Sequence, residues 1–302
     1  MSKLKIFASI LFIMSLNVSC AQSTTPLYPH AIPNSKPAAD EEMKEEGDGR
    51  VFINKISVPT ISYYPAVKGK STGQCVIIFP GGGYGGNAIA HEGWDVAKKF
   101  NEEGITAFVV KYRIPSERIM KDPSIGPLQD AQQAMIYVRS NAAQWGINPN
   151  KIGIMGFSAG GHLASTLGTH YRKALVDNPK NISLRPDFLM LIYPVISSDT
   201  AISHKGSFEN LLGKNASADK MLEYSNEKQV TDDTPPTFLV HASDDDVVPV
   251  ENVLVFYEAL HKHNVPAELH IYPGGGHGFG LKNPTTADNW MDRAKNWLAQ
   301  LK

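Results

Sequence analysis

The pentapeptide Gly156-Phe157-Ser158-Ala159-Gly160 places a hydroxyl between two glycines at the spacing of a nucleophile turn. It follows an apolar run over 151–155, expected to be a strand, and precedes a helical pattern over 159–170. A sharp turn between strand and helix lifts the Ser158 hydroxyl off the sheet edge. The Ala159 N–H then lies at a helix N-terminus, which favours an anion. We therefore predict Ser158 as a nucleophile and Ala159 as an oxyanion donor; the alternative is a glycine-rich turn with an incidental serine.

A second glycine-rich turn, Pro80-Gly81-Gly82-Gly83-Tyr84, follows the apolar run 75–79. Glycines let backbone N–H groups point into a site without interference from side chains. By position, we predict Gly82 and Gly83 as the other oxyanion donors. A flexible turn and a phosphate loop are the alternatives, but a phosphate loop would need Lys-Ser/Thr after the glycines. Because that pair is absent, the sequence argues against a kinase or another nucleotide-binding protein.

Candidate acids and a candidate base follow two later strands. Asp244, Asp245 and Asp246 follow the expected strand 237–241. His277 lies between glycines after the expected strand 267–272, where a close approach to Ser158 is sterically possible. We predict Asp245 as the acid that orients His277, with Asp244 and Asp246 left open.

The chain order Ser, Asp, His is that of α/β hydrolases. These residues predict acyl transfer, in which Ser158 attacks a carbonyl while His277 acts as general base. Water then cleaves the acyl-enzyme with His277 again as base.

Short apolar runs alternate with helical patterns along the rest of the chain, which is typical of a mostly parallel sheet with helices on both faces. The expected strands are 52–58, 75–79, 105–112, 151–155, 188–193, 237–241 and 267–272. The expected helices are 92–103, 127–143, 159–170, 250–263 and 285–301. The fold class is therefore α/β, an α/β-hydrolase fold with a small insertion around 198–235 near the active face.

Composition narrows the function further. With 302 residues and a net charge of −1, the chain suits one large α/β domain and carries no basic excess for nucleic acid or an anionic membrane. The two cysteines, Cys20 and Cys75, exclude a disulfide scaffold and a cysteine-rich zinc site. Neither an HxxxH nor an HExxH pair occurs, so the sequence argues against a zinc site. No metal or organic cofactor is implied by the residues.

The N-terminus resembles an export leader. Lys3 and Lys5 precede an apolar run over 6–16, too short to span a bilayer. Two forms of processing remain open: cleavage after Ala21, or lipidation of Cys20, which would be the protein's membrane contact. We expect a signal peptide over 1–20, a Pro-rich tether or strap over 21–50 and a catalytic domain over 51–302. The expected location is exported: periplasmic, outer-membrane lipoprotein or secreted.

Several longer strings resemble the bacterial acetylxylan and feruloyl esterase group of α/β hydrolases, which is BD-FAE-like and often labelled xylanase-like. These strings lie at 80–84, 91–93, 111–113, 156–165, 193–196, 241–249 and 276–280. Lipase relatives usually have His before the three glycines, whereas this chain has Pro80, which fits the carbohydrate esterases. The resemblance implies removal of acetyl, and as a second candidate feruloyl, groups from acylated polysaccharide such as xylan. Glycosidic cleavage would need two facing carboxylates, whereas the residues assembled here serve acyl transfer.

Two other functions stay open. One is a general short-chain carboxylesterase or a peptidase of the same fold. The other is a surface-anchored binding protein on an inactive hydrolase scaffold, against which the complete set of Ser158, Asp245 and His277 argues.

Overall fold

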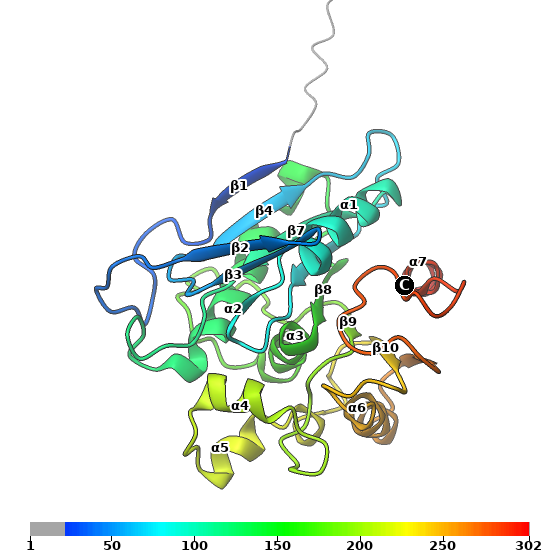
Figure 1. The fold of residues 1–302 in the computed structure, drawn as a ribbon. Helices are drawn as coiled ribbons and strands as arrows, with labels where there is room; N and C mark the ends of the chain where they lie inside the picture. Colours follow the sequence, from blue (N-terminus) through cyan, green and yellow to red (C-terminus); the bar gives the residue numbers. More distant parts are fainter. Residues whose placement is uncertain (1–21, 302) are drawn as a thin grey trace, which may run out of the picture.

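An eight-stranded sheet forms the centre of the computed structural model, which describes residues 22–301 (Figure 1). The strand order is β1-β4-β7-β5-β8-β9-β10-β11. The bounds are β1 (Ser23–Pro26), β4 (Thr60–Tyr64), β7 (Thr106–Lys111), β5 (Cys75–Phe79), β8 (Ile152–Phe157), β9 (Leu189–Ile192), β10 (Thr237–Ala242) and β11 (Ala267–Tyr272). Neighbours from β7 to β11 are parallel, whereas β1 and β4 pair antiparallel. The predicted mostly parallel sheet is confirmed.

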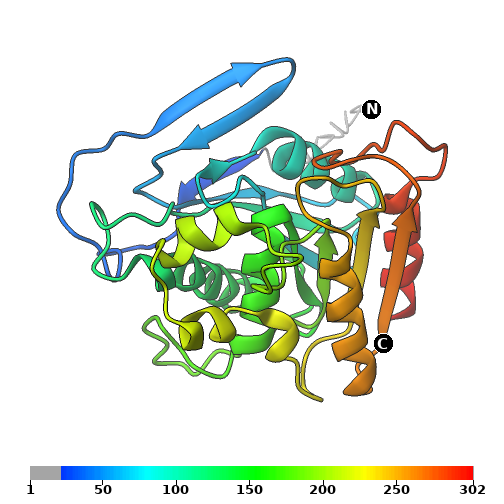
Figure 2. The ribbon, with the colours of Figure 1, turned by 60° about the horizontal axis from the view of Figure 1, so that its bottom comes forward.

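Helices cover both faces of this sheet, as predicted. α1 (Asp95–Glu102) and α7 (Trp290–Gln300) lie on one face, joined by an ion pair between Lys295 and Glu103. α2 (Gly126–Ser140), α3 (Ser158–His170) and α6 (Glu251–Lys262) lie on the other (Figure 2). The four central strands β5, β8, β9 and β10 are buried at every residue, which explains their continuous apolar sequences. Cys75 is among them, and burial raises the pKa of its thiol.

The structure differs from the predicted elements in several places. Of the strand predicted over 52–58, only the first three residues are a strand: β3 (Arg50–Asn54) ends where Lys55 takes a positive φ of 52°, and β4, which was not predicted, begins at Thr60. β3 belongs to a separate sheet with β2 (Met43–Gly47) and β6 (Gly86–Asn87). The helix predicted over 285–301 begins at Trp290, because the Asn289 side chain accepts the N–H of Met291 and caps the first turn.

The segment predicted as a tether or strap contributes to both sheets, through β1 and β2. A buried ion pair between Arg113 and Asp130 fixes it, with 2.7 Å between guanidinium and carboxylate. Arg113 also donates to the Pro33 carbonyl at 2.9 Å, and the Tyr28 hydroxyl donates to Asp130 at 2.9 Å. This buried charge pair therefore holds the N-terminal segment in addition to the pairing of β1 with β4 and of β2 with β3.

The insertion predicted at 198–235 lies between β9 and β10. It contains α4 (Lys205–Leu212), α5 (Ala218–Glu223) and a 3₁₀ turn (Asn226–Lys228). Asn210 of α4 donates to the Gly83 carbonyl at 2.8 Å, which places the insertion against the glycine turn after β5.

The predicted signal peptide, Cys20 and the cleavage position at Ala21 lie outside the described residues. Within 22–301, none of the helices combines the length and the apolar character that crossing a bilayer requires.

We expect Asp130→Ala to lower the free energy of unfolding by about 3–5 kcal/mol, because it leaves the buried Arg113 charge without its partner. Urea denaturation followed by tryptophan fluorescence would measure the change. Glu258→Ala, which removes an exposed ion pair with Lys262, is the matched control and should unfold as the unaltered protein does. Equal stability of the Asp130 variant would contradict the role given to this pair.

Candidate active site

Ser158 sits on a strained turn between β8 and α3. Its φ is +51°, a conformation that residues with a side chain rarely adopt. Two glycines permit the turn: a Cβ on Gly156 would lie 2.0 Å from the Gly160 carbonyl oxygen, and one on Gly160 would lie 2.1 Å from that of Phe79. The glycines of the pentapeptide are therefore required by close backbone contacts, and they hold the hydroxyl at the pocket floor.

His277 connects Ser158 to a buried carboxylate. Its Nε2 lies 2.9 Å from Ser158 Oγ, and its Nδ1 lies 2.7 Å from Asp245 Oδ2. A carboxylate only accepts hydrogen bonds, so Nδ1 carries the proton and Nε2 is free to accept the serine hydroxyl. The three residues predicted from the sequence thus come together in the arrangement of a serine hydrolase triad.

Asp245 is the member of the three aspartates that contacts His277. Its other oxygen accepts the N–H groups of Val247 and Val248 at 3.0 and 2.8 Å. Burial alone would raise the pKa of Asp245, but hydrogen bonds from His241 and His277 outweigh it and hold that pKa well below its usual range. Asp244 instead accepts the N–H groups of Gly275 and Gly276, which fixes the loop that carries His277.

Asp246, the third open candidate, is exposed and does not line the pocket with Ser158. Asp245 is therefore the residue placed to stabilise a charged imidazole.

Three backbone N–H groups near Ser158 are available to an anion. Gly82 and Gly83 line the pocket beside Ser158, with φ of +129° and +63°. Within residues 22–301, no hydrogen bond joins their N–H groups, or that of Ala159, to an acceptor. The neighbouring Gly81 N–H is already paired with Glu92 at 2.8 Å, which leaves the two glycines assigned from sequence as the available donors of this turn.

Glu92 links two loops of the site, a role that sequence analysis missed. One oxygen accepts the Gly81 N–H, and the other accepts the Tyr193 hydroxyl at 2.9 Å. That hydroxyl in turn accepts the Gly280 N–H at 2.9 Å, in the loop that carries His277. Glu92 is buried, so its two hydrogen bonds replace hydration. The sequence around Glu92 does not reveal these two partners, because Gly81 lies 11 residues and Tyr193 lies 101 residues away along the chain.

His241 is a second missed residue. It is fully buried, and its Nε2 lies 3.1 Å from Asp245 Oδ2 and 2.9 Å from the Val248 carbonyl. Both partners are acceptors, so Nε2 carries the proton and donates. The one signal in the sequence is a histidine at a strand end, four residues before the acid.

The histidine in α3 packs behind the nucleophile and has a structural role. His162 is buried, and its ring nitrogens lie 2.9 Å from the Tyr84 hydroxyl and 2.9 Å from the Tyr224 carbonyl. Burial lowers the pKa of His162 to about 4, so it is neutral near pH 7. Tyr84 is buried with it and does not present a ring to the pocket.

The pocket above Ser158 has a volume of about 390 Å³. One wall comes from a segment that sequence analysis did not connect to the site, since Arg50, Val51 and Phe52 belong to β3. Another includes His204 of the insertion, which was predicted to lie near the active face. The Phe52 ring packs on the glycine turn, where a Cβ on Gly86 would lie 2.3 Å from it. Within the described range 22–301, no three His, Cys, Asp or Glu side chains gather as metal ligands.

Comparisons with known proteins identify the family of the chain. The BD-FAE family model matches residues 62–260. An acetylxylan esterase of Xylanibacter ruminicola is 42% identical over 76% of this chain and 46% of its own length. An endo-1,4-beta-xylanase B of Butyrivibrio fibrisolvens is 37% identical over 72% of this chain and 34% of its own. The chain thus spans less than half the length of these curated relatives.

Among solved structures, an acetyl ester-xyloside bifunctional hydrolase from Caldicellulosiruptor lactoaceticus is 40% identical. It matches 92% of this chain and 95% of its own with a TM-score of 0.78, so the likeness extends over nearly the whole fold. With this overlap and the match to residues 62–260, the chain belongs to the BD-FAE family and has an α/β-hydrolase fold.

Proposed function

We propose that this protein is a serine esterase that removes acetyl groups from a plant cell-wall polysaccharide such as xylan through an acyl-enzyme. The observation that carries the proposal is the hydrogen-bonded series Ser158, His277 and Asp245 beside unpaired N–H groups. The names of the Xylanibacter and Caldicellulosiruptor relatives support acetyl as the acyl group and a xylose-based substrate. Feruloyl is a second candidate acyl group, which rests on the resemblance of the sequence alone.

The mechanism follows from the geometry. His277 Nε2 takes the Ser158 proton as the hydroxyl oxygen attacks the ester carbonyl. The N–H groups of Gly82, Gly83 and Ala159 bind the oxyanion, at about 3 kcal/mol per donor in the transition state. Asp245 stabilises the charged imidazole, which then protonates the leaving alcohol. Water enters, gives its proton to His277 and releases the acid from Ser158.

The names of two relatives suggest glycosidic cleavage, but the residues that line this pocket suit that reaction less well than ester hydrolysis. Within residues 22–301 the pocket is lined by one carboxylate, Glu92, and both its oxygens already accept hydrogen bonds. A glycosidase needs two facing carboxyl groups, one of them able to give a proton. The alternative that remains is a general short-chain carboxylesterase or a peptidase that uses the same triad.

We also propose that the protein is exported, because a polymer substrate is met outside the cytoplasm and the N-terminus resembles a leader. Mass spectrometry of the mature N-terminus decides between the two forms of processing, lipidation of Cys20 and cleavage after Ala21. A lipidated Cys20 indicates a membrane anchor, a free Gln22 indicates cleavage after Ala21, and an intact Met1 would contradict export.

Acid release from acetylated xylan and from a feruloylated arabinoxylan oligosaccharide tests the substrate. We expect acetate, measured by chromatography, with 4-nitrophenyl acetate as the reference ester. Cleavage of the reference ester alone would overturn the xylan assignment in favour of the general carboxylesterase. Ferulate released with acetate would add the second acyl group.

We expect Ser158→Ala to lower kcat about 10⁴-fold or more on every ester, because it removes the hydroxyl that is hydrogen-bonded to His277 and forms the acyl-enzyme. The circular dichroism spectrum and thermal midpoint should stay close to those of the wild type. If the folded variant still turned over esters, the assignment of Ser158 would be contradicted and another residue would have to be the nucleophile.

For His241, we expect His241→Phe to lower kcat about 10–100-fold with little change in KM, because Asp245 loses a donor that helps to hold it ionised and in place. His241→Gln is the matched control, since its side-chain amide reaches the Nε2 position and keeps an N–H. Steady-state kinetics on 4-nitrophenyl acetate measure both. Equal losses in the two variants would show that packing, and not the hydrogen bond, is what His241 supplies.

A further inference from the structure

His204 brings the insertion into the catalytic pocket. It precedes α4 and lines the pocket together with Ser158, His277 and Gly83. A Cβ built on Gly83 would lie 3.9 Å from His204 Cε1, so the ring stands beside the glycine turn. Asn210, two turns further along α4, donates to the Gly83 carbonyl at 2.8 Å and fixes the helix against that turn. The imidazole therefore has a defined place at the rim of the oxyanion site.

The hydrogen bonds of His204 determine which ring nitrogen carries the proton. Its Nδ1 faces the first turn of α4, 2.8 Å from Ser207 Oγ and 3.3 Å from the Ser207 backbone nitrogen. A backbone N–H only donates, and the positive end of a helix favours a lone pair over another N–H. Nδ1 is therefore the acceptor that caps α4, and the proton is on Nε2.

The His204 ring is neutral, and its Nε2–H has no hydrogen-bond partner in the described part of the protein. Burial, and then the neighbouring His277, lower the pKa of His204, so the ring stays neutral near pH 7. Among residues 22–301, no side chain or carbonyl is hydrogen-bonded to His204 Nε2, although Nδ1 is fully engaged. A neutral N–H without a protein partner, at the rim of a catalytic pocket, is suited to bind an oxygen of the substrate.

We propose that His204 Nε2–H donates a hydrogen bond to the alcohol part of the ester, at a sugar hydroxyl or ring oxygen next to the acylated position. An acetyl group has one acceptor, its carbonyl, which the N–H groups of Gly82, Gly83 and Ala159 already bind. A further donor therefore has to meet the alcohol side. There an acylated sugar offers hydroxyl and ring oxygens next to the ester, whereas 4-nitrophenyl acetate offers only its ester oxygen and a distant nitro group, both weak acceptors. His204 is thus a specificity residue for acylated carbohydrate, and this assignment rests on the proposed esterase function.

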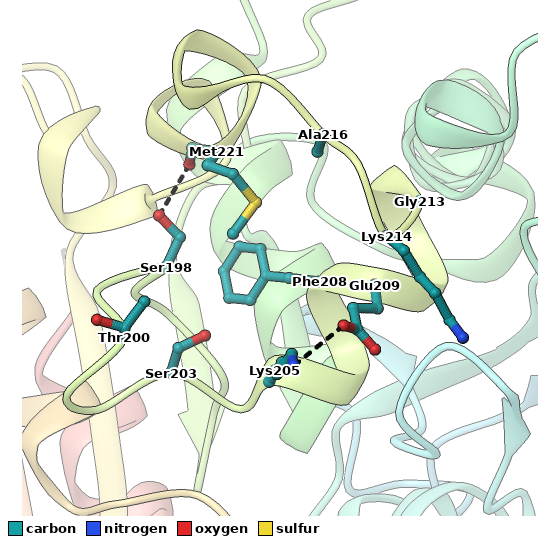
Figure 3. Close-up of a pocket in the computed structure, with 10 residues that line it drawn as sticks. All are labelled: Ser198, Thr200, Ser203, Lys205, Phe208, Glu209, Gly213, Lys214, Ala216 and Met221. Atoms are coloured by element: carbon teal, nitrogen blue, oxygen red, sulfur yellow. Dashed lines mark hydrogen bonds and ion pairs between the residues drawn. The ribbon is translucent and has the colours of Figure 1, made fainter.

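The residues on either side of His204 face elsewhere and provide the control. Ser203 and Lys205 line a separate pocket of about 210 Å³ inside the insertion, next to Phe208 and Met221 (Figure 3). The Lys205 side chain is 84% exposed and pairs with Glu209 at 3.5 Å. Lys205→Ala therefore changes the same helix start without reaching the catalytic pocket.

Two substitutions separate the two nitrogens of His204. Asn reaches the Nδ1 position, so His204→Asn keeps an acceptor that caps α4 and withdraws the donor from the pocket. Gln reaches the Nε2 position, so His204→Gln keeps a donor in the pocket and weakens the cap. The test compares kcat/KM for acetylated xylo-oligosaccharides with kcat/KM for 4-nitrophenyl acetate in these variants, Lys205→Ala and the wild type.

We expect His204→Asn to lower the sugar-to-aryl ratio of kcat/KM about 10-fold, chiefly through a higher KM for the sugar ester. His204→Gln should restore most of the ratio, and Lys205→Ala should leave it unchanged. An unchanged ratio in His204→Asn, or an equal loss of kcat/KM on both esters, would overturn the role proposed for His204 but not the proposed esterase function. Absence of acetate release from any acetylated sugar by the wild type would overturn the proposed function and this role with it.

Discussion

The strained turn at Ser158 is the constraint on which the rest of the site depends. A positive φ at a residue with a side chain is unfavourable by roughly 1–3 kcal/mol, so the surroundings must enforce it. Here the enforcing contacts are backbone to backbone: Gly156 lies against Gly160, and Gly160 against the end of β5. The same contacts bring α3 up to the glycine turn, so the hydroxyl and the oxyanion donors are positioned together. A rigid buried sheet beneath them makes this possible.

Two buried carboxylates then fix the loops around that turn. Asp245 accepts hydrogen bonds from His277, His241, Val247 and Val248, so the acid loop and the base share one centre. Glu92 joins the glycine turn to the His277 loop through Tyr193. Each buried charge is stabilised by several donors, and each would be costly to leave unpaired. Three loops from distant parts of the chain are thereby held in one geometry.

The sequence predicted what is local and missed what depends on packing. The triad residues stand in glycine-rich or acidic loops that follow predicted strands, namely Ser158, Asp245 and His277. The strand pattern and the loop composition lie within a few residues of each other, so a short stretch of sequence contains both. The partners of Glu92 and the pocket wall at Phe52 come from other loops and strands, so periodicity carries no trace of them. The insertion was expected near the active face, but the place of His204 in the pocket depends on packing. The error at 52–58 has the same origin, since the strand ends at Asn54, where the chain leaves the small sheet of β3 on its way to β4 in the large sheet.

Covalent labelling with a fluorophosphonate tests the central claim most directly, because attack by an activated serine oxygen forms a P–O bond and expels fluoride. We expect one adduct per chain, found by peptide mass spectrometry on Ser158. We also expect that prior denaturation abolishes the reaction, since the activation comes from the folded turn and from His277. A folded protein that is not labelled, or one labelled at another serine, would contradict the account.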